Sequence, residues 1–153
     1  VNASWSDVTL NGANGSVIGT YDVLQLAGSG DSVVGDWSSI SFDTAAGAVE
    51  SISGSSNTIN FGAGTTASVT GSNDTINLGT GSSLTSSGGG GDTIYATSDD
   101  ALALNGAAGN METLHVSDDQ NITLGGNSAF NVIGSDNTLN AGAGDLLVAS
   151  NDA

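Results

Sequence analysis

A short apolar segment recurs about every nine residues along the chain, and this period constrains the fold more than any other feature. The central aliphatic residues of these segments span 139 residues in sixteen intervals, a mean spacing of 8.7. They are Val8, Val17, Leu24, Val33, Ile40, Val49, Ile59, Val69, Ile76, Leu84, Ile94, Leu102, Leu114, Ile122, Val132, Leu139 and Leu147. The segments between them are rich in Gly, Asn, Asp and Ser, which favour tight turns. We therefore expect short strands joined by turns, with essentially no helix.

Near-copies of one segment decide between the two folds that such strands could form. Residues 54–66 read GSSNTINFGAGTT, and residues 71–83 read GSNDTINLGTGSS. Like residues recur at Asn57, Asp74 and Asp92, which is after two strands rather than one. Stacked rungs of a parallel coil explain this likeness, and antiparallel pairing in a sandwich does not.

The sequence therefore predicts an all-β, right-handed parallel β-solenoid, similar to a β-roll, with about eight rungs of 17–18 residues. Such a rod would be about 40 Å long. We expect residues 1–153 to form a single domain, in which rungs over 1–52 are less regular than those over 53–147.

The charge of the chain excludes several classes of partner. It has sixteen acidic residues and no Lys or Arg, which gives a formal net charge of −16. Nothing is available to neutralise phosphate, so we expect no binding to nucleic acid or anionic lipid. No apolar stretch is long enough to insert into a membrane. The first residues, VNASWSDVTL, lack a basic segment and an apolar segment, so we expect any targeting signal to be already removed or to lie elsewhere.

Residues 87–95, SGGGGDTIY, resemble the nonapeptide calcium-binding repeat of RTX (repeats-in-toxin) proteins, G-G-x-G-x-D-x-U-x. Partial copies occur at 28–33, 70–76 and 142–147. The resemblance implies a parallel β-roll that is acidic, secreted by bacteria and folded around Ca²⁺ held in its turns. The metal ligands that it implies are Asp74, Asp92, Gly90, Asp31 and Asp145.

One position departs from this calcium motif. The residue before Thr-Ile or Thr-Leu alternates between amide and acid, as Asn57, Asp74, Asp92, Glu112 and Asn137. Amides can stack in hydrogen-bonded ladders that need no cation. We therefore expect most rungs to be free of calcium, with one or two sites left, the best of them at the edge that carries Asp74 and Asp92.

Other polar residues offer weaker sites. His115 is expected to point outward beside Glu112 or Tyr95, and no second His or nucleophile pattern makes it catalytic. The acid pairs Asp99-Asp100 and Asp118-Asp119 are expected in loops. Each pair could be a solvated turn, hold a loop Ca²⁺ or act as paired glycosidase acids, and we favour the solvated turn.

Two further surfaces remain open. Thr-x-Asn pairs at 58–60, 75–77 and 138–140 would form flat outward ladders that could bind ice. Trp5, Tyr21 and Trp37 could stack on sugar rings, although aromatic residues more commonly cover an open core, which is the use that we favour.

The expected function is non-enzymatic. The repeat runs from Val8 to Leu147 without a helix, Pro or Lys to protect its end strands, so the chain is expected to stack on neighbouring repeats or to be cut from a longer solenoid. We expect a structural or adhesive module of an extracellular bacterial surface protein or fibre, with local or weak Ca²⁺ binding. Its expected partners are copies of itself, neighbouring repeats or a cell-surface polysaccharide. The alternative is a Ca²⁺-dependent folding and secretion module of a secreted enzyme, and ice binding is third.

Overall fold

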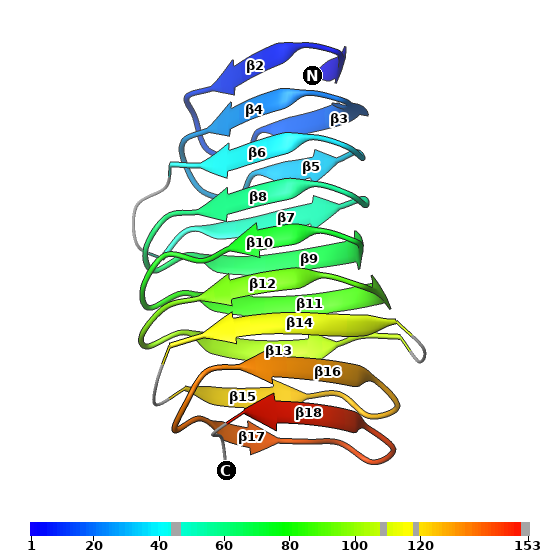
Figure 1. Cartoon of the computed structure of the whole chain (residues 1–153). Coiled ribbons are helices and arrows are strands. Elements are labelled where there is room, and N and C mark those ends of the chain that lie inside the picture. The colour runs from blue at the N-terminus through cyan, green and yellow to red at the C-terminus, as the bar shows by residue number, and fades with distance from the viewer. Residues whose placement is uncertain (44–46, 108–109, 118–119, 151–153) are drawn as a thin grey trace.

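The chain is an all-β parallel β-solenoid of about eight turns, which confirms the predicted fold class. The computed structural model describes residues 1–43, 47–107, 110–117 and 120–150. The strands lie in two layers stacked along one axis, with the N-terminus and the C-terminus at opposite ends (Figure 1). These residues contain no helix. They therefore contain no helix that is long and apolar enough to cross a membrane. The right-handed coiling expected from the sequence stays a prediction.

Over the described residues, each layer is one parallel sheet of nine strands. Sheet A contains β1 (Asn2–Ser4), β3 (Ser16–Thr20), β5 (Ser32–Val34), β7 (Val49–Ser53), β9 (Thr66–Ser72), β11 (Ser83–Gly90), β13 (Ala101–Asn105), β15 (Asn121–Leu124) and β17 (Thr138–Asn140). Sheet B contains β2 (Asp7–Leu10), β4 (Val23–Leu26), β6 (Ser39–Phe42), β8 (Thr58–Phe61), β10 (Thr75–Asn77), β12 (Thr93–Ala96), β14 (Met111–Val116), β16 (Ala129–Ile133) and β18 (Leu146–Ser150). Consecutive strands therefore alternate between the sheets.

Rung length varies more than the sequence period predicts. Asp7 pairs with Val23, 16 positions further on, whereas Thr58 pairs with Thr75 at 17 positions. The longest steps, of 20 positions, join Thr93 to Thr113 and Ala101 to Asn121. The paired strands stay in register across these steps, so their side chains keep the same inward and outward alternation and the core tolerates the variation.

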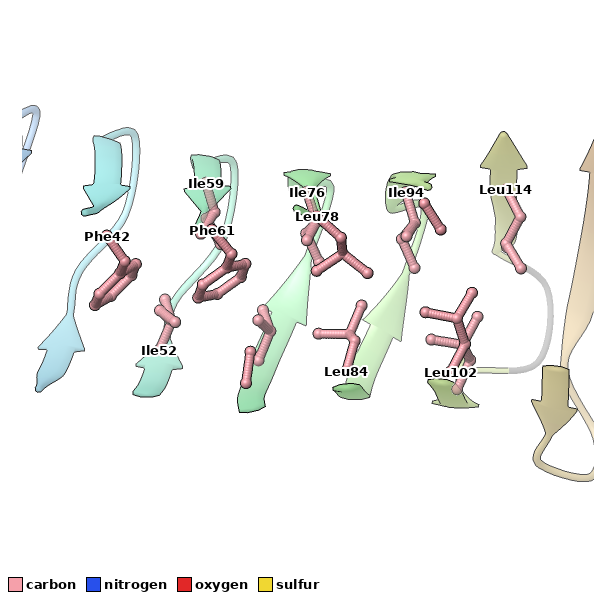
Figure 2. Close-up of a cluster of buried hydrophobic side chains, with 14 of the residues drawn as sticks. Phe42, Ile52, Ile59, Phe61, Ile76, Leu78, Leu84, Ile94, Leu102 and Leu114 are labelled. Atoms are coloured by element: carbon pink, nitrogen blue, oxygen red, sulfur yellow. The ribbon is translucent and has the colours of Figure 1, made fainter. Parts of the chain in front are cut away.

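The core is a continuous double row of aliphatic and aromatic side chains between the sheets. Figure 2 shows side chains of sheet B, such as Phe61 and Ile76, pointing toward Ile52 and Leu84 of sheet A. Phe42 and Phe61, in neighbouring rungs, stack with ring centroids 5.1 Å apart. Because each apolar side chain lies above a similar one, the hydrophobic stabilisation extends through every internal rung.

Two of the marked aliphatic residues do not belong to this core. Val49 is 57% exposed, because it lies on the outward face of β7, where Glu50 and Ile52 point inward instead. Successive side chains of a strand point to opposite faces, so Val49 is one position away from the inward row. Leu147 is 36% exposed because it lies on β18, the last strand of sheet B, which has a neighbour on one side only.

A repeated turn conformation connects the sheets. We call the turns from sheet A to sheet B the first corner, and those from sheet B to sheet A the second corner. In most turns one residue has positive φ and comes directly before a residue whose side chain points inward. In the first corner this position is occupied by Trp5, Tyr21, Trp37, Ser56, Asn73, Gly91, Asn127 and Gly144. In the second corner it is occupied by Asn14, Gly30, Gly47, Gly64, Gly81, Asp99 and Asp136.

Candidate functional site

A ladder of polar side chains lines the inside of the first corner. The oxygen of each side chain accepts a hydrogen bond from the backbone N–H of the equivalent residue one rung nearer the N-terminus. Asn57 N–H donates to Asp74 Oδ1 at 2.7 Å, Asp74 N–H to Asp92 Oδ1 at 2.8 Å, and Asp92 N–H to Glu112 Oε2 at 3.1 Å. The same bond joins Ser6 to Asp22, Asp22 to Ser38 and Ser38 to Asn57. Six consecutive bonds thus tie seven rungs together at this corner.

The second corner contains a similar ladder in two parts. In the first part, Gly15 N–H donates to Asp31 Oδ1 and Asp31 N–H donates to Glu50 Oε2. The second part runs through Thr65, Ser82, Asp100, Gln120 and Asn137, each N–H donating to the next side chain. The break falls at β7, because Glu50 pairs with Ala67, whose side chain has no oxygen.

Several carboxyl groups of these ladders are buried. Burial raises the pKa of Asp74, Glu112 and Glu50 to about 7 in each case, mainly because the charged form loses its water. Nearby acids raise these values further, such as Asp92 beside Asp74 and Glu112. Burial likewise raises the pKa of Asp92 and Asp100.

Asn57 shows how a ladder position is fully satisfied. Its Oδ1 accepts the Ser38 N–H, and its Nδ2 donates to the Gly35 carbonyl at 3.0 Å. Asp74 takes the same place one rung further, but its Oδ2 is buried and has no hydrogen-bond partner among the residues that the structure describes. A buried oxygen of this kind is costly when it is charged, which agrees with the raised pKa.

A column of glycines leaves room for these inward side chains. A Cβ on Gly71 would lie 2.9 Å from Asp74 Oδ2 and would collide with the Gly54 carbonyl oxygen. A Cβ on Gly19 would collide in the same way with the Ala3 carbonyl and Asp22. Gly19 and Gly71 each lie three residues before an inward side chain of the first corner. Close packing therefore requires glycine at these positions, in addition to any need of the turn.

The predicted metal ligands lie at different places in this arrangement. Asp74 and Asp92 stack in the first corner, as expected, whereas Asp31 lies in the second corner. Asp145 is in the last first-corner turn, where its Oδ1 accepts the Ser128 N–H and its Oδ2 the Gly142 N–H. Gly90, with φ of +74°, lies at a register irregularity of β11 opposite Ser72. Of these predicted ligands the structure thus brings together Asp74 and Asp92, with Gly90 at the end of β11, two residues before Asp92.

These residues do not fit the calcium site that the toxin-repeat resemblance implies. In the described part of the chain, no three His, Cys, Asp or Glu side chains are grouped so that they could hold a metal ion. Ca²⁺ takes six to eight oxygen ligands, whereas Asp74 and Asp92 are almost fully buried and each already accepts a backbone N–H. Among the described residues, the corner therefore lacks accessible ligands for the ion, and Ca²⁺ binding elsewhere stays a prediction.

Two sequence assignments at residues 137–140 are wrong. Asn137 does not continue the column of Asn57, Asp74, Asp92 and Glu112, because it lies in the second corner and bonds to Gln120. Thr138 and Asn140 belong to sheet A, whereas the other Thr-x-Asn pairs lie on sheet B. Both corners use the same turn, a positive-φ residue followed by an inward polar residue, so the local sequence does not distinguish them.

The remaining polar residues have structural positions. His115 lies beside Tyr95, as one of the two expectations had it, with ring centroids 4.7 Å apart in a parallel stack. Asp100 is buried in the second-corner ladder and also accepts the Thr97 N–H, so the solvated turn expected for it is wrong. Asp99 beside it occupies the positive-φ position. The pair Asp118-Asp119 lies outside the described residues.

Three aromatic side chains form a column on the outside of the first corner. Trp5 and Tyr21 stack with ring centroids 4.3 Å apart, and Tyr21 and Trp37 with centroids 6.2 Å apart, each at an interplanar angle of 12°. Trp5 is 78% exposed and Trp37 is 59% exposed, so the expectation that they cover an open core is wrong. Their backbones have positive φ, which turns these side chains outward while the next residue turns inward. We call these three residues the aromatic column.

Sequence reasoning missed this column, although a signal was present. Trp5, Tyr21 and Trp37 are spaced by 16 residues, which is the rung length of this part of the chain. Each also comes directly before a small or acidic inward residue, namely Ser6, Asp22 or Ser38.

Comparison of the chain with models of protein families, with curated proteins and with solved structures found no match. The fold is therefore shown by the structure alone.

Proposed function

We propose that the chain is a non-enzymatic structural and adhesive module, a stiff acidic rod within an extracellular bacterial surface protein or fibre. The observation that carries this proposal is the continuity of the rod. One hydrophobic core and the corner ladders pass through successive rungs, and the positive-φ residues repeat the same backbone bond, as from Tyr21 N–H to the Asp36 carbonyl. A structure held by identical neighbour contacts resists bending and can be extended by adding rungs.

The two ends of the rod support assembly with further rungs. The outermost strands, β1 and β2 at one end and β17 and β18 at the other, each pair on one side only. At the second end, Leu146 is 60% exposed and Val148 is 52% exposed. Open strand edges with apolar side chains and no Lys or Pro favour pairing with another strand. The added rung belongs either to a neighbouring segment of solenoid or to a second molecule.

Sedimentation velocity and electron microscopy of the purified chain test this assembly. We expect the weight-average mass to rise with protein concentration and short filaments to be visible. Leu147→Lys places a charge at the free end and should abolish the association, whereas Ser68→Lys, on the exposed face of β9, should leave it unchanged. Monomers at every concentration, or equal association of both variants, would contradict the proposal.

A threonine column on sheet B favours ice binding as a second candidate. Thr58, Thr75, Thr93 and Thr113 are paired in register in four successive strands. Beside them, Asn77 Nδ2 donates to Asn60 Oδ1 at 2.9 Å, and the next two residues of that row are Tyr95 and His115. Thermal hysteresis that is lost in Thr75→Lys would support this function, and no hysteresis in the unmodified protein would remove it.

A further inference from the structure

We propose that the first corner between Trp37 and Asn73 binds an uncharged polysaccharide, one sugar ring of which stacks on the exposed face of Trp37. This inference rests on the proposed adhesive function and names its ligand class. The first observation that supports it is the backbone conformation of the aromatic column. Trp5, Tyr21 and Trp37 have φ between 57° and 59°, a region that bulky side chains rarely adopt.

The fold itself does not need aromatic residues at these positions. The equivalent places in other rungs are occupied by Ser56, Asn73 and Asn127, which suit the conformation better or are smaller. Strained backbone that the fold could avoid is typical of functional sites. Since the three side chains are also exposed, they add a surface feature rather than core stability.

The spacing of the rings leaves aromatic faces open. Rungs of a parallel sheet are about 4.8 Å apart. A centroid distance of 6.2 Å between near-parallel rings therefore means that Trp37 is displaced sideways from Tyr21. On its other side, the next residue of the corner is Ser56, which is too small to cover an indole. The face of Trp37 toward Ser56 is the one available to a ligand.

Polar groups lie one and two rungs beyond that open face. Ser55 Oγ and Ser72 Oγ are 3.3 Å apart, and Asn73 Nδ2 donates to Ser72 Oγ at 3.4 Å. Asp36, next to Trp37, accepts the Ser55 N–H through Oδ1. Hydroxyl, amide and carboxylate groups beside an aromatic face match a pyranose ring. The C–H groups of the sugar contact the negative face of the indole while its hydroxyls bond to the polar groups.

The charge of the chain limits the polysaccharide to an uncharged one. With sixteen acids and no Lys or Arg, the protein repels uronic acid, sulfated and phosphorylated polymers. The corner runs along the axis of the solenoid, so a polymer chain can extend from Trp37 over the small residues of the following rungs. A neutral glucan, mannan or chitin-type chain has the required chemistry.

Tryptophan fluorescence provides a direct test, because the only two Trp residues of the chain are both in the aromatic column. The probes are soluble cello-, chito- and laminari-oligosaccharides, mannan and dextran, with alginate as the acidic comparison. We expect at least one neutral probe to change the emission, and we expect alginate to have no effect. Trp37→Asn, which keeps a residue suited to positive φ, should weaken binding by at least about tenfold. Tyr95→Ala, which removes an exposed aromatic residue from sheet B, should bind as the unmodified protein does.

Affinity electrophoresis in gels that contain each polymer gives a second readout, without fluorescence, for Trp37→Asn. Binding of none of the neutral probes, binding of alginate instead, or equal binding by Trp37→Asn would each overturn the proposal. Measuring the concentration-dependent association of Trp37→Asn separates a failure of sugar binding from a failure of the proposed rod function. A variant that assembles but binds no sugar leaves the structural function intact.

Discussion

The backbone N–H of Asp74 donates a hydrogen bond to Oδ1 of Asp92, one rung further along the solenoid, at a distance of 2.8 Å. Both side chains are almost fully buried. Two acids are therefore stacked inside the rod, and each links its rung to the previous one. The stability of this arrangement therefore depends on whether the two carboxyl groups are protonated.

The free energy of unfolding should fall as the pH rises from about 4 to about 7. In the folded protein the pKa values of Glu50, Asp74 and Glu112 are about 7, compared with ordinary values of 4.5, 3.8 and 4.5. Between these limits the folded state binds more protons than the unfolded state, so raising the pH favours unfolding. The contribution is complete below pH 4 and lost above pH 7. Guanidinium unfolding at pH 4.5, 6 and 8 measures it, and a midpoint that rises with pH would contradict the prediction.

Asp74→Asn should stabilise the protein by about 1–2 kcal/mol at pH 8 and much less at pH 5. Asn57 shows the expected geometry, because its Nδ2 donates to a glycine carbonyl in the place where Asp74 has an unpartnered Oδ2. The reverse change, Asn57→Asp, is the matched control and should destabilise the protein most at pH 8. Equal effects of either variant at both pH values would show that the carboxyl charge has no part in the ladder.

Gly71→Ala should destabilise the solenoid by about 3 kcal/mol. Its Cβ would collide with the Gly54 carbonyl and would approach Asp74 Oδ2 to 2.9 Å, so a strand of sheet A would have to move. Gly12→Ala is the control, since no atom lies within 4 Å of its Cβ position and its φ is not positive. It should change the free energy of unfolding by less than about 0.5 kcal/mol. A similar loss in both variants, measured by thermal unfolding, would mean that close packing at Gly71 is not the cause.

The period of the sequence was enough to predict the fold, because stacked rungs repeat the same environment. Ile59, Ile76 and Ile94 recur at intervals of 17 and 18, and they form one row of the core. Which of the two corners a given turn belongs to was not predictable, as Asn137 shows. Both corners use the same local sequence, a positive-φ residue followed by an inward polar residue. Val49 was misplaced because Glu50, an acid, takes an inward position that a search for apolar residues passes over.

The candidate site was predicted less well than the fold. Asp74 and Asp92 were correctly expected to stack, but their inward direction follows from the positive φ of Asn73 and Gly91, which the residue types alone do not reveal. The aromatic column was missed because an aromatic residue at positive φ is unusual, so Trp5, Tyr21 and Trp37 were expected to cover an open core, with stacking on sugars as the other possibility.

Circular dichroism with and without calcium tests the central claim most directly. If backbone N–H groups and protons satisfy the buried carboxyls, the ladders need no cation. We therefore predict the same β-sheet spectrum and the same guanidinium midpoint in 5 mM EDTA and in about 5 mM Ca²⁺ at pH 6. A coil spectrum in EDTA that becomes β-sheet when Ca²⁺ is added would contradict the account and favour a calcium-dependent folding module.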